Sequence, residues 1–305
     1  TAVYLAFRGP VIVAPSANWA MYEHPATQDN LRLLAERGVE VLPTGVGALA
    51  CGETGSGRMV EPEEILAAVK RAFATGAGGA LAGRKVVVTA GGTREPLDAV
   101  RFIGNRSSGK MGRAVADDAY LRGAEVVLID AAVGGREVPY RRVTVETSDD
   151  MASAVATEAA DAEVLVMAAA VADFKPERPQ TGEKIGRADR ARLTLELVPT
   201  VDILAASERA GLVRVGFVAE AGPRLDRARA KKAAKGVDLL VFNDILAAGV
   251  GIGSDENEIT MLTPKEEIHV ARSPKEECAR AVLDQVEALL AGRARPTSPD
   301  KEKAP

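Results

Sequence analysis

The feature of this 305-residue chain that most limits its possible folds is an alternation of short β-branched runs with longer segments of helical spacing. Such alternation is typical of βαβ units, in which helices join parallel strands. We therefore expect an α/β protein with a parallel sheet. The expected strands are Val11 to Pro15, Val39 to Pro43, Lys85 to Ala90, Glu125 to Asp130, Glu163 to Ala169, Arg214 to Glu220 and Asp238 to Asp244.

A glycine- and alanine-rich segment, Thr75 to Lys85, has neither helical nor strand period and predicts a domain boundary. We expect a first domain at residues 1–76, a linker at 77–84 and a second domain at 85–292. The polar, proline-interrupted end at 293–305 is expected to be a disordered tail. Because the first expected strand would normally follow earlier β/α units, we expect the natural chain to begin before Thr1.

Composition excludes several classes of function. The formal net charge of −4 argues against nucleic acid or an anionic membrane surface as the main partner. Cys51 and Cys278 lie far apart, which fits a reducing cytoplasm better than a disulfide framework. The sequence has no signal peptide and no apolar run of about twenty residues, so we expect neither export nor membrane insertion. With two histidines in the chain, a histidine-rich metal site is not expected.

The stretch GNRSSGKM, from Gly104 to Met111, differs at one residue from a nucleotide-binding P-loop. The P-loop requires Ser or Thr where Met111 stands, and its first glycine follows a strand directly, whereas thirteen residues separate Ala90 from Gly104. A dinucleotide-binding G-x-G-x-x-G turn would need glycine at Ser107. Neither motif is complete.

The same stretch precedes a helix expected from about Ser108 to Arg122. Ser107 or Ser108 can cap this helix, and its N–H groups and positive dipole end, with Lys110 nearby, can form an anion site. The residues themselves leave two alternatives open, a phosphate site and an ordinary glycine-rich βα turn.

Longer motifs give a family resemblance. The segment Thr89 to Gly112 resembles the signature of the phosphopantothenate–cysteine ligase half of bifunctional coenzyme A biosynthesis proteins. The resemblance covers about two thirds of the chain and continues through Ala168 to Pro176, Glu183 to Arg187, Val201 to Leu204, Gly216 to Glu220, Lys231 to Asp244 and Gly253 to Leu262. Pro15 to Asn30 and Ala50 to Met59 resemble the end of the flavin-dependent decarboxylase half.

The resemblance implies a Rossmann-like parallel-sheet ligase domain preceded by the C-terminal part of a flavodoxin-like α/β domain. It also implies CTP-dependent joining of 4'-phosphopantothenate to L-cysteine through an acyl-cytidylate, with Mg²⁺. Such an enzyme would be cytoplasmic and a homodimer through its ligase half, and a higher oligomer where the decarboxylase half is complete. Two other functions stay open: a nicotinamide dehydrogenase using Gly109, Gly112 and Asp130, and a nucleotide-binding fragment without turnover.

The resemblance also assigns residues to the ligation. Asn105 and Arg101 would act on the acyl-cytidylate, Lys184 would clamp charge on phosphorus, and Asp173 would meet ribose or Mg²⁺. By residue type, Asn105 could equally be a turn residue, Asp173 a helix cap and Lys184 a solvated charge. The CTP-binding positions implied are Ser107, Ser108, Gly109, Lys110, Gly112, Ala169, Ala170, Asp173, Lys184, Val201, Asp202, Ile203, Leu204, Phe217, Lys231 and Lys235.

Lys231 and Lys235 are spaced i, i+4 and should share one helix face, which by itself would be read as solvated. One departure from the family is Gly186, where a lysine is usual, so positive charge is reduced there. Cys278 has apolar partners at helical spacing and predicts core packing rather than chemistry.

For the decarboxylase part, the resemblance assigns Asn18 to the substrate carboxylate and Cys51 to proton donation. Decarboxylation in this family also needs FMN and a histidine that lies upstream, in β/α units that we expect to precede Thr1. We therefore expect this chain to bind no FMN and to release no CO₂.

Overall fold

The computed structural model describes residues 2–48, 52, 54–76, 80–131, 137–179, 182–186, 192–220, 222, 224–246, 250 and 253–293. By its internal contacts the chain forms two compact units. One comprises Thr1–Ala82 with Leu121–Gly123, and the other comprises Gly83–Tyr120 with Ala124–Pro305.

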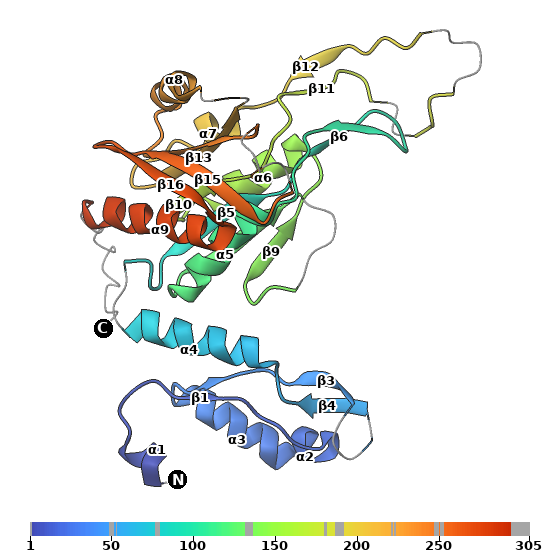
Figure 1. Ribbon diagram of the computed structural model, residues 1–305. Coiled ribbons are helices and arrows are strands. Elements are labelled where there is room, and N and C mark those ends of the chain that lie inside the picture. Colours follow the sequence, from blue (N-terminus) through green and yellow to red (C-terminus); the bar gives the residue numbers. More distant parts are fainter. Residues whose placement is uncertain are drawn as a thin grey trace, which may run out of the picture. The chain divides into compact units, whose positions relative to one another are not determined.

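The first unit pairs helices with short strands (Figure 1). The two strands expected here are present as β1 and β2, which pair in parallel, while β3 and β4 form an antiparallel pair. No helix among the described residues of the chain is long and apolar enough to cross a membrane. The elements are α1 (Ala2–Ala6), β1 (Ile12–Val13), α2 (Trp19–Glu23), α3 (Pro25–Glu36), β2 (Glu40–Val41), β3 (Gly45–Ala48), β4 (Thr54–Arg58) and α4 (Pro62–Gly76).

The second unit is built on an eight-stranded sheet with the order β16-β15-β14-β13-β10-β5-β8-β9. The strands from β14 to β9 are parallel, and β15 and β16 extend the sheet in antiparallel fashion. Its strands are β5 (Lys85–Ala90), β8 (Glu125–Asp130), β9 (Arg141–Thr144), β10 (Val164–Met167), β13 (Val213–Glu220), β14 (Leu239–Asp244), β15 (Glu256–Leu262) and β16 (Glu267–Pro274). The expected α/β class with a mainly parallel sheet is confirmed.

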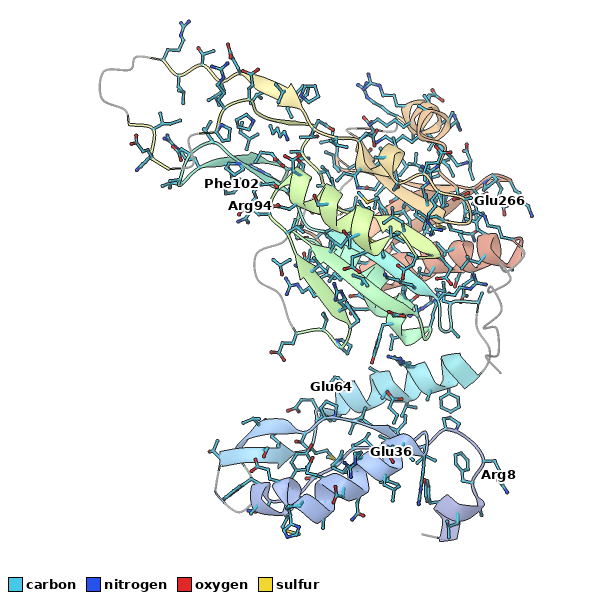
Figure 2. The ribbon with its side chains drawn as sticks, turned by 180° about the vertical axis from the view of Figure 1, so that it is seen from behind. Arg8, Glu36, Glu64, Arg94, Phe102 and Glu266 are labelled. Carbon is cyan, nitrogen blue, oxygen red and sulfur yellow. The ribbon has the colours of Figure 1, made fainter. Side chains whose placement is uncertain are left out.

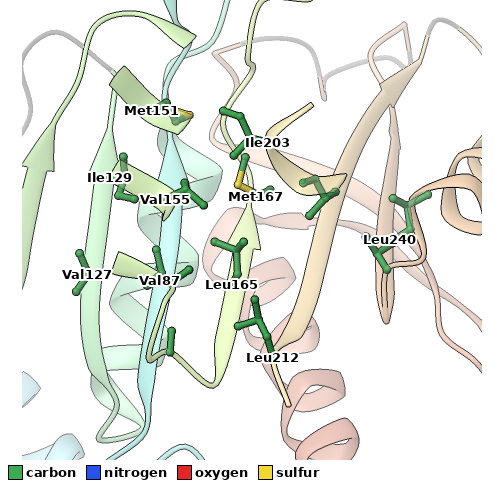
Figure 3. Close-up of a cluster of buried hydrophobic side chains, with 14 of the residues drawn as sticks. Val87, Val127, Ile129, Met151, Val155, Leu165, Met167, Ile203, Leu212 and Leu240 are labelled. Atoms are coloured by element: carbon green, nitrogen blue, oxygen red, sulfur yellow. The ribbon is translucent and has the colours of Figure 1, made fainter. Parts of the chain in front are cut away.

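Helices cover both faces of this sheet. On one face, alternate strand residues such as Val87 and Leu165 pack with Met151 and Val155 in a buried cluster (Figure 3). The helices on this face are α6 (Ser148–Glu158), α7 (Ile203–Ala206) and α8 (Leu225–Lys235). Helices α5 (Lys110–Leu121) and α9 (Lys275–Ala291) cover the other face (Figure 1). Cys278 of α9 is fully buried, and burial raises its pKa to about 11, in keeping with a core residue.

The connections define a switch point in the sheet. From β5 the chain passes through α5 to β8 on one side, whereas β10 is followed by β13 on its other side. The strands β5 and β10 are parallel neighbours. The strand that follows β5 is added on one side of this pair and the strand that follows β10 on the other, so the strand order reverses between them. In open α/β sheets, ligands bind in the crevice outside the carboxyl ends of such strands.

Two hairpins project from the carboxyl edge of the sheet (Figure 1). One pairs β6 (Arg94–Pro96) with β7 (Phe102–Gly104), and the other pairs β11 (Phe174–Pro176) with β12 (Leu197–Pro199). In the first, the Arg94 guanidinium lies 4.8 Å from the centroid of the Phe102 ring. Both side chains are labelled in Figure 2. The segment between β5 and α5 therefore contains a hairpin, held by cross-strand bonds and a cation–π contact, that the sequence analysis did not predict.

Candidate active site

A cavity of about 680 Å³ lies at the carboxyl ends of β5, β10 and β13, where the sheet changes direction. The segments that line it come from the start of α5, the loop after β10, the loop before α7, the end of β13, and α8 and α9. They include residues 105–112, 167–173, 200–204, 217–219, Lys231, Lys235, Asn243, Ile245, Val250, Gly253, Asn257 and Lys275.

The loop after β10 is bonded to the end of β5. The Ala169 and Ala172 amides donate to the hydroxyls of Thr89 and Thr93 at 3.1 and 2.9 Å, and the Ala170 amide donates to the Gly91 carbonyl at 2.8 Å. Both threonines are fully buried, so their hydroxyls serve as fixed acceptors. These bonds hold the 168–173 segment beside the start of α5.

The start of α5 approaches β5 closely. A Cβ atom at Gly112 would lie 2.6 Å from the Thr89 carbonyl oxygen, so only glycine fits there. Gly109 has φ +72°, a conformation that L side chains rarely adopt. The helix begins at Lys110 rather than at Ser108, and its N-terminus faces the cavity.

The two serines expected to cap α5 make long contacts just ahead of it. The Ser107 hydroxyl accepts from the Gly109 amide at 3.4 Å, and the Ser108 hydroxyl accepts from the Lys110 amide at 3.5 Å. These i, i+2 contacts lie in the turn before the helix. The helix cannot extend back to the serines, because Gly109 has a positive φ.

Lysines at the cavity are paired with carboxylates. Lys231 donates to Glu220 at 2.7 Å, and Lys235 lies 3.4 Å from Asp202. The hydrogen bond from Lys231 lowers the pKa of Glu220. The prediction that Lys231 and Lys235 share one face of a helix is confirmed, since both line the same cavity from α8.

The charge balance of the cavity differs from that of the chain. Among the described residues that line it, five are basic and two are acidic, although the chain has a net charge of −4. The basic residues are Arg106, Lys110, Lys231, Lys235 and Lys275, and the acidic ones are Asp173 and Asp202. Such a lining favours an anionic ligand, which would compete with Glu220 and Asp255 for Lys231 and Lys110.

An apolar wall lies beside these charges. Ile203 and Leu204 are buried, and Val201 and Phe217, which are also among the CTP-binding positions that the family resemblance implies, line the cavity beside them. Asp202 caps α7 by accepting from the Ala205 amide at 3.1 Å, so its carboxylate holds this short helix at the cavity.

Asn105 and Asp173 line the cavity near one another in the fold. The Asn105 side-chain amide donates to the Val171 carbonyl at 2.9 Å, which orients its side-chain oxygen. Asp173 is exposed, and its carbonyl accepts from the Thr200 amide at 3.0 Å. The predicted cap role of Asp173 is wrong, since β11 rather than a helix follows it.

Arg101 and Lys184, in contrast, do not line the cavity. The Arg101 guanidinium is bound to the Asp98 carboxylate and to the Ile185 carbonyl, the latter at 2.7 Å. Lys184 is exposed on the segment that this arginine holds. The structure therefore does not bring Arg101 and Lys184 together with Asn105 at the cavity, because the Arg101 guanidinium is held by Asp98 and the Ile185 carbonyl.

Asp98 is the centre of this contact, which we call the clasp (Asp98, Arg101 and the 183–185 segment). Its carboxylate has no exposed surface and accepts from the Val100, Arg101 and Ile185 amides as well as from the Arg101 guanidinium. The Ala99 amide also donates to the Glu183 carbonyl at 3.2 Å. The arginine and these amides hold the pKa of Asp98 well below its usual range.

Sequence reasoning missed Asn243, Asn257 and Lys275. Asn243 lies near the carboxyl end of β14, so the rule for parallel strands could have found it. Asn257 and Lys275 reach the cavity through the antiparallel strands β15 and β16, and no local signal predicts that.

Asp130 and Asn18, two residues assigned from the sequence, do not line the cavity. Asp130, the acidic residue of the dehydrogenase alternative, is fully buried and paired with Arg113 and Arg142 at 3.3 and 2.9 Å. It therefore cannot reach a ribose. Asn18 belongs to the first unit, where its side chain accepts from the Ala20 amide and caps α2. Cys51 lies outside the described residues.

Metal ligands are sparse. The described part of the chain contains no group of three or more His, Cys, Asp or Glu side chains placed to hold a metal ion. Asp173 offers one carboxylate at the cavity. One carboxylate together with phosphate oxygens of a substrate is a usual Mg²⁺ environment, so these residues fit a Mg²⁺ ion that arrives with a nucleotide.

Comparison with known proteins places both units in described families. Residues 81–290 match the DNA/pantothenate metabolism flavoprotein C-terminal domain, and residues 1–74 match the flavoprotein family. The chain is 42% identical over 309 residues to the coenzyme A biosynthesis bifunctional protein CoaBC of Mycobacterium bovis, covering 96% of this chain and 73% of the relative. The protein of the same name from Bacillus subtilis is 40% identical over 265 residues, or 86% and 65% of the two chains.

Solved structures of related proteins have a similar fold. The C-terminal domain of a CoaBC protein superposes with a TM-score of 0.60 at 33% identity, covering 70% of this chain and all of that domain. A mutant of Cab2 in complex with phosphopantothenate-cysteine superposes with a TM-score of 0.56 at 16% identity, covering 75% and 94%, which shows a shared fold.

Proposed function

The chain belongs to the family of bifunctional coenzyme A biosynthesis proteins, and we propose that its second unit joins 4'-phosphopantothenate to L-cysteine at the expense of CTP. The observation that carries this proposal is the excess of positive charge in a cavity at the sheet's switch point. Both substrates of the first step are polyanions, so the site must gather cations before they react.

In the first step, a carboxylate oxygen of 4'-phosphopantothenate attacks the α-phosphorus of CTP, and the bond from that phosphorus to the bridging oxygen breaks. Pyrophosphate leaves with the bonding electrons. Lys110, Lys231 and Lys235 would neutralise the triphosphate, and backbone amides at the start of α5 would donate to it. The apolar group at Ile203, Leu204 and Phe217 would take the base.

In the second step, the cysteine amine attacks the acyl carbon, the bond between that carbon and the oxygen bridging to phosphorus breaks, and CMP leaves with this oxygen. The amine proton passes to solvent. Asn105 is oriented by Val171 at the cavity wall, so its side-chain oxygen could hold the incoming amine without adding a charge. The clasp would present Lys184 from outside the cavity, because Ile185 is fixed by Asp98 and Arg101.

When bound, Mg²⁺ would supply further neutralisation of the phosphates. Asp173 is the side chain that would hold it. FMN belongs to the flavoprotein part of the family, of which residues 1–74 form a part.

The proposal is tested by pyrophosphate release. We expect release that requires both CTP and 4'-phosphopantothenate, with amide formation on adding cysteine. Release from CTP alone, or NADH binding in place of CTP binding, would contradict it. A fragment that binds CTP without turnover would show binding by calorimetry and no pyrophosphate.

A further inference from the structure

The turn at residues 254–256 is held mainly by Lys275, and within the turn the Glu256 amide donates to the Ser254 hydroxyl at 3.2 Å. The backbone amide of Lys275 donates to the Asp255 carbonyl at 3.0 Å. Its Nζ donates to the Ser254 carbonyl and, at 3.1 Å, to the Glu256 carbonyl. Lys275 is the first residue of α9 and is only 8% exposed. All three carbonyls of the turn accept from this residue, one from its backbone amide and two from its Nζ, so Lys275 fixes the conformation of the turn.

This turn directs the Asp255 side chain outward, where it is 89% exposed. Its carboxylate accepts a hydrogen bond from Lys110 Nζ at 2.6 Å, and the same Nζ donates to the Gly253 carbonyl at 2.9 Å. The bond from Lys110 lowers the pKa of Asp255, so the carboxylate is charged at neutral pH. Asp255 therefore forms an ion pair with Lys110, the first residue of α5, at the cavity.

Stability alone does not account for this arrangement. An exposed Asp–Lys pair contributes little to folding, about 0–1 kcal/mol. Lys275, which holds the turn, is buried, and burial followed by the proximity of Lys110 lowers its pKa. Burying an ammonium opposes folding. Lys275 is buried and positions the exposed Asp255 carboxylate beside Lys110. This arrangement is better explained by a role in ligand binding.

We propose that Asp255 is an internal counter-ion at the phosphate end of the cavity, which a polyphosphate displaces from Lys110. This inference rests on the proposed function and deepens it. The ligand class is the β- and γ-phosphates of a nucleoside triphosphate, or free pyrophosphate. Lys275 acts as a positioning residue, because it holds the turn that presents the carboxylate.

The consequence for the reaction is a balance between binding and release. While the triphosphate is bound, Lys110 pairs with phosphate and Asp255 is displaced toward solvent. After the bond to the α-phosphorus breaks, the carboxylate competes with pyrophosphate for Lys110 and repels it. Asp255 thus weakens nucleotide binding and speeds the departure of pyrophosphate.

Calorimetric titration of the full chain with inorganic pyrophosphate tests the proposal. Asp255→Asn keeps the shape and removes the charge, so we expect pyrophosphate to bind about three- to tenfold more tightly at low salt, with a smaller gain at high salt. The matched control is Asp161→Asn. Asp161 pairs with Lys85 at 2.5 Å. Lys85 is the first residue of β5 and therefore lies at the amino end of that strand, away from the cavity at the carboxyl ends. We expect the control to leave pyrophosphate affinity unchanged within about twofold.

A second variant tests the positioning role. In a Lys275→Met background, whose folding is checked by circular dichroism, Asp255→Asn should change pyrophosphate affinity by less than about twofold, because the turn has lost both bonds from Nζ and keeps only the backbone bond to the Asp255 carbonyl. An equal effect in both backgrounds would overturn the role of Lys275.

Pyrophosphate binding that is the same in wild type and Asp255→Asn, or absent in both, would overturn the inference even in an active ligase. Tighter binding in Asp255→Asn without any CTP-dependent turnover would instead support the phosphate site and contradict the proposed function.

Discussion

Gly112→Ala tests how the fold positions the candidate phosphate site. The added methyl would point at β5, 2.6 Å from the Thr89 carbonyl oxygen and 2.8 Å from Ala90 Cβ, and not into the cavity. Ordinary contacts begin near 3.4 Å, so the start of α5 must move by about 0.8 Å. Any effect on nucleotide binding would therefore act through the position of the helix.

The magnitudes follow from this shift. Overpacking costs about 1–3 kcal/mol, and alanine returns about 1 kcal/mol of helix propensity, so the net loss of stability should be about 1 kcal/mol. A misplacement near 1 Å in a reacting site can lower the rate on the order of a hundredfold. We expect a fall in melting temperature of about 2–4 °C and a loss of ligation of roughly tenfold to a hundredfold.

The assay is steady-state pyrophosphate release together with calorimetric CTP affinity. Ala114→Gly is the control, because it lies on the same helix and should cost about 0.5–1 kcal/mol without a contact to force the helix away. Wild-type turnover by Gly112→Ala, or equal loss in both variants, would refute the reasoning.

Three further predictions concern the clasp and the substrate contacts. Asp98→Asn should lower ligase activity and make the melting temperature depend less on pH in the acid range. A carboxyl with a lowered pKa stabilises the fold at neutral pH and loses that contribution as pH falls through its folded pKa. An acid dependence of the melting temperature equal to that of the wild type would contradict this. Lys184→Gln should mainly slow formation of the acyl-cytidylate, whereas Asn105→Asp should let it accumulate, as rapid-quench analysis would show; wild-type turnover removes the residue from the mechanism. Gly186→Lys should tighten CTP binding more at low salt than at high salt, and an affinity unchanged at low salt would show that this segment does not face the triphosphate.

Buried parallel strands were the part of the fold most readily predicted from the sequence. Lys85–Ala90 and Glu125–Asp130 match their expected bounds, because strands covered on both faces read as continuous apolar runs. The hairpins escaped prediction because prolines and charges interrupt their short strands. Glu256–Leu262 carried a signal that was overlooked, since its buried residues alternate with partly exposed ones.

The candidate site was predictable where one segment supplies several residues. The stretch from Asn105 to Gly112 lines the cavity continuously. Lys275 and Asp255 were not predictable, because the antiparallel strands β15 and β16 bring them to the start of α5 from far along the chain. The clasp was equally hidden, since Asp98 and Ile185 meet only in the folded hairpin region.

Isotope transfer tests the central claim most directly. 4'-Phosphopantothenate labelled with ¹⁸O in its carboxylate would be incubated with CTP, cysteine and the full chain, and the products analysed by mass spectrometry. Attack of the carboxylate on the α-phosphorus predicts that one labelled oxygen appears in CMP. Label in inorganic phosphate with CDP as the other product, or no transfer of label during amide formation, would contradict an acyl-cytidylate route.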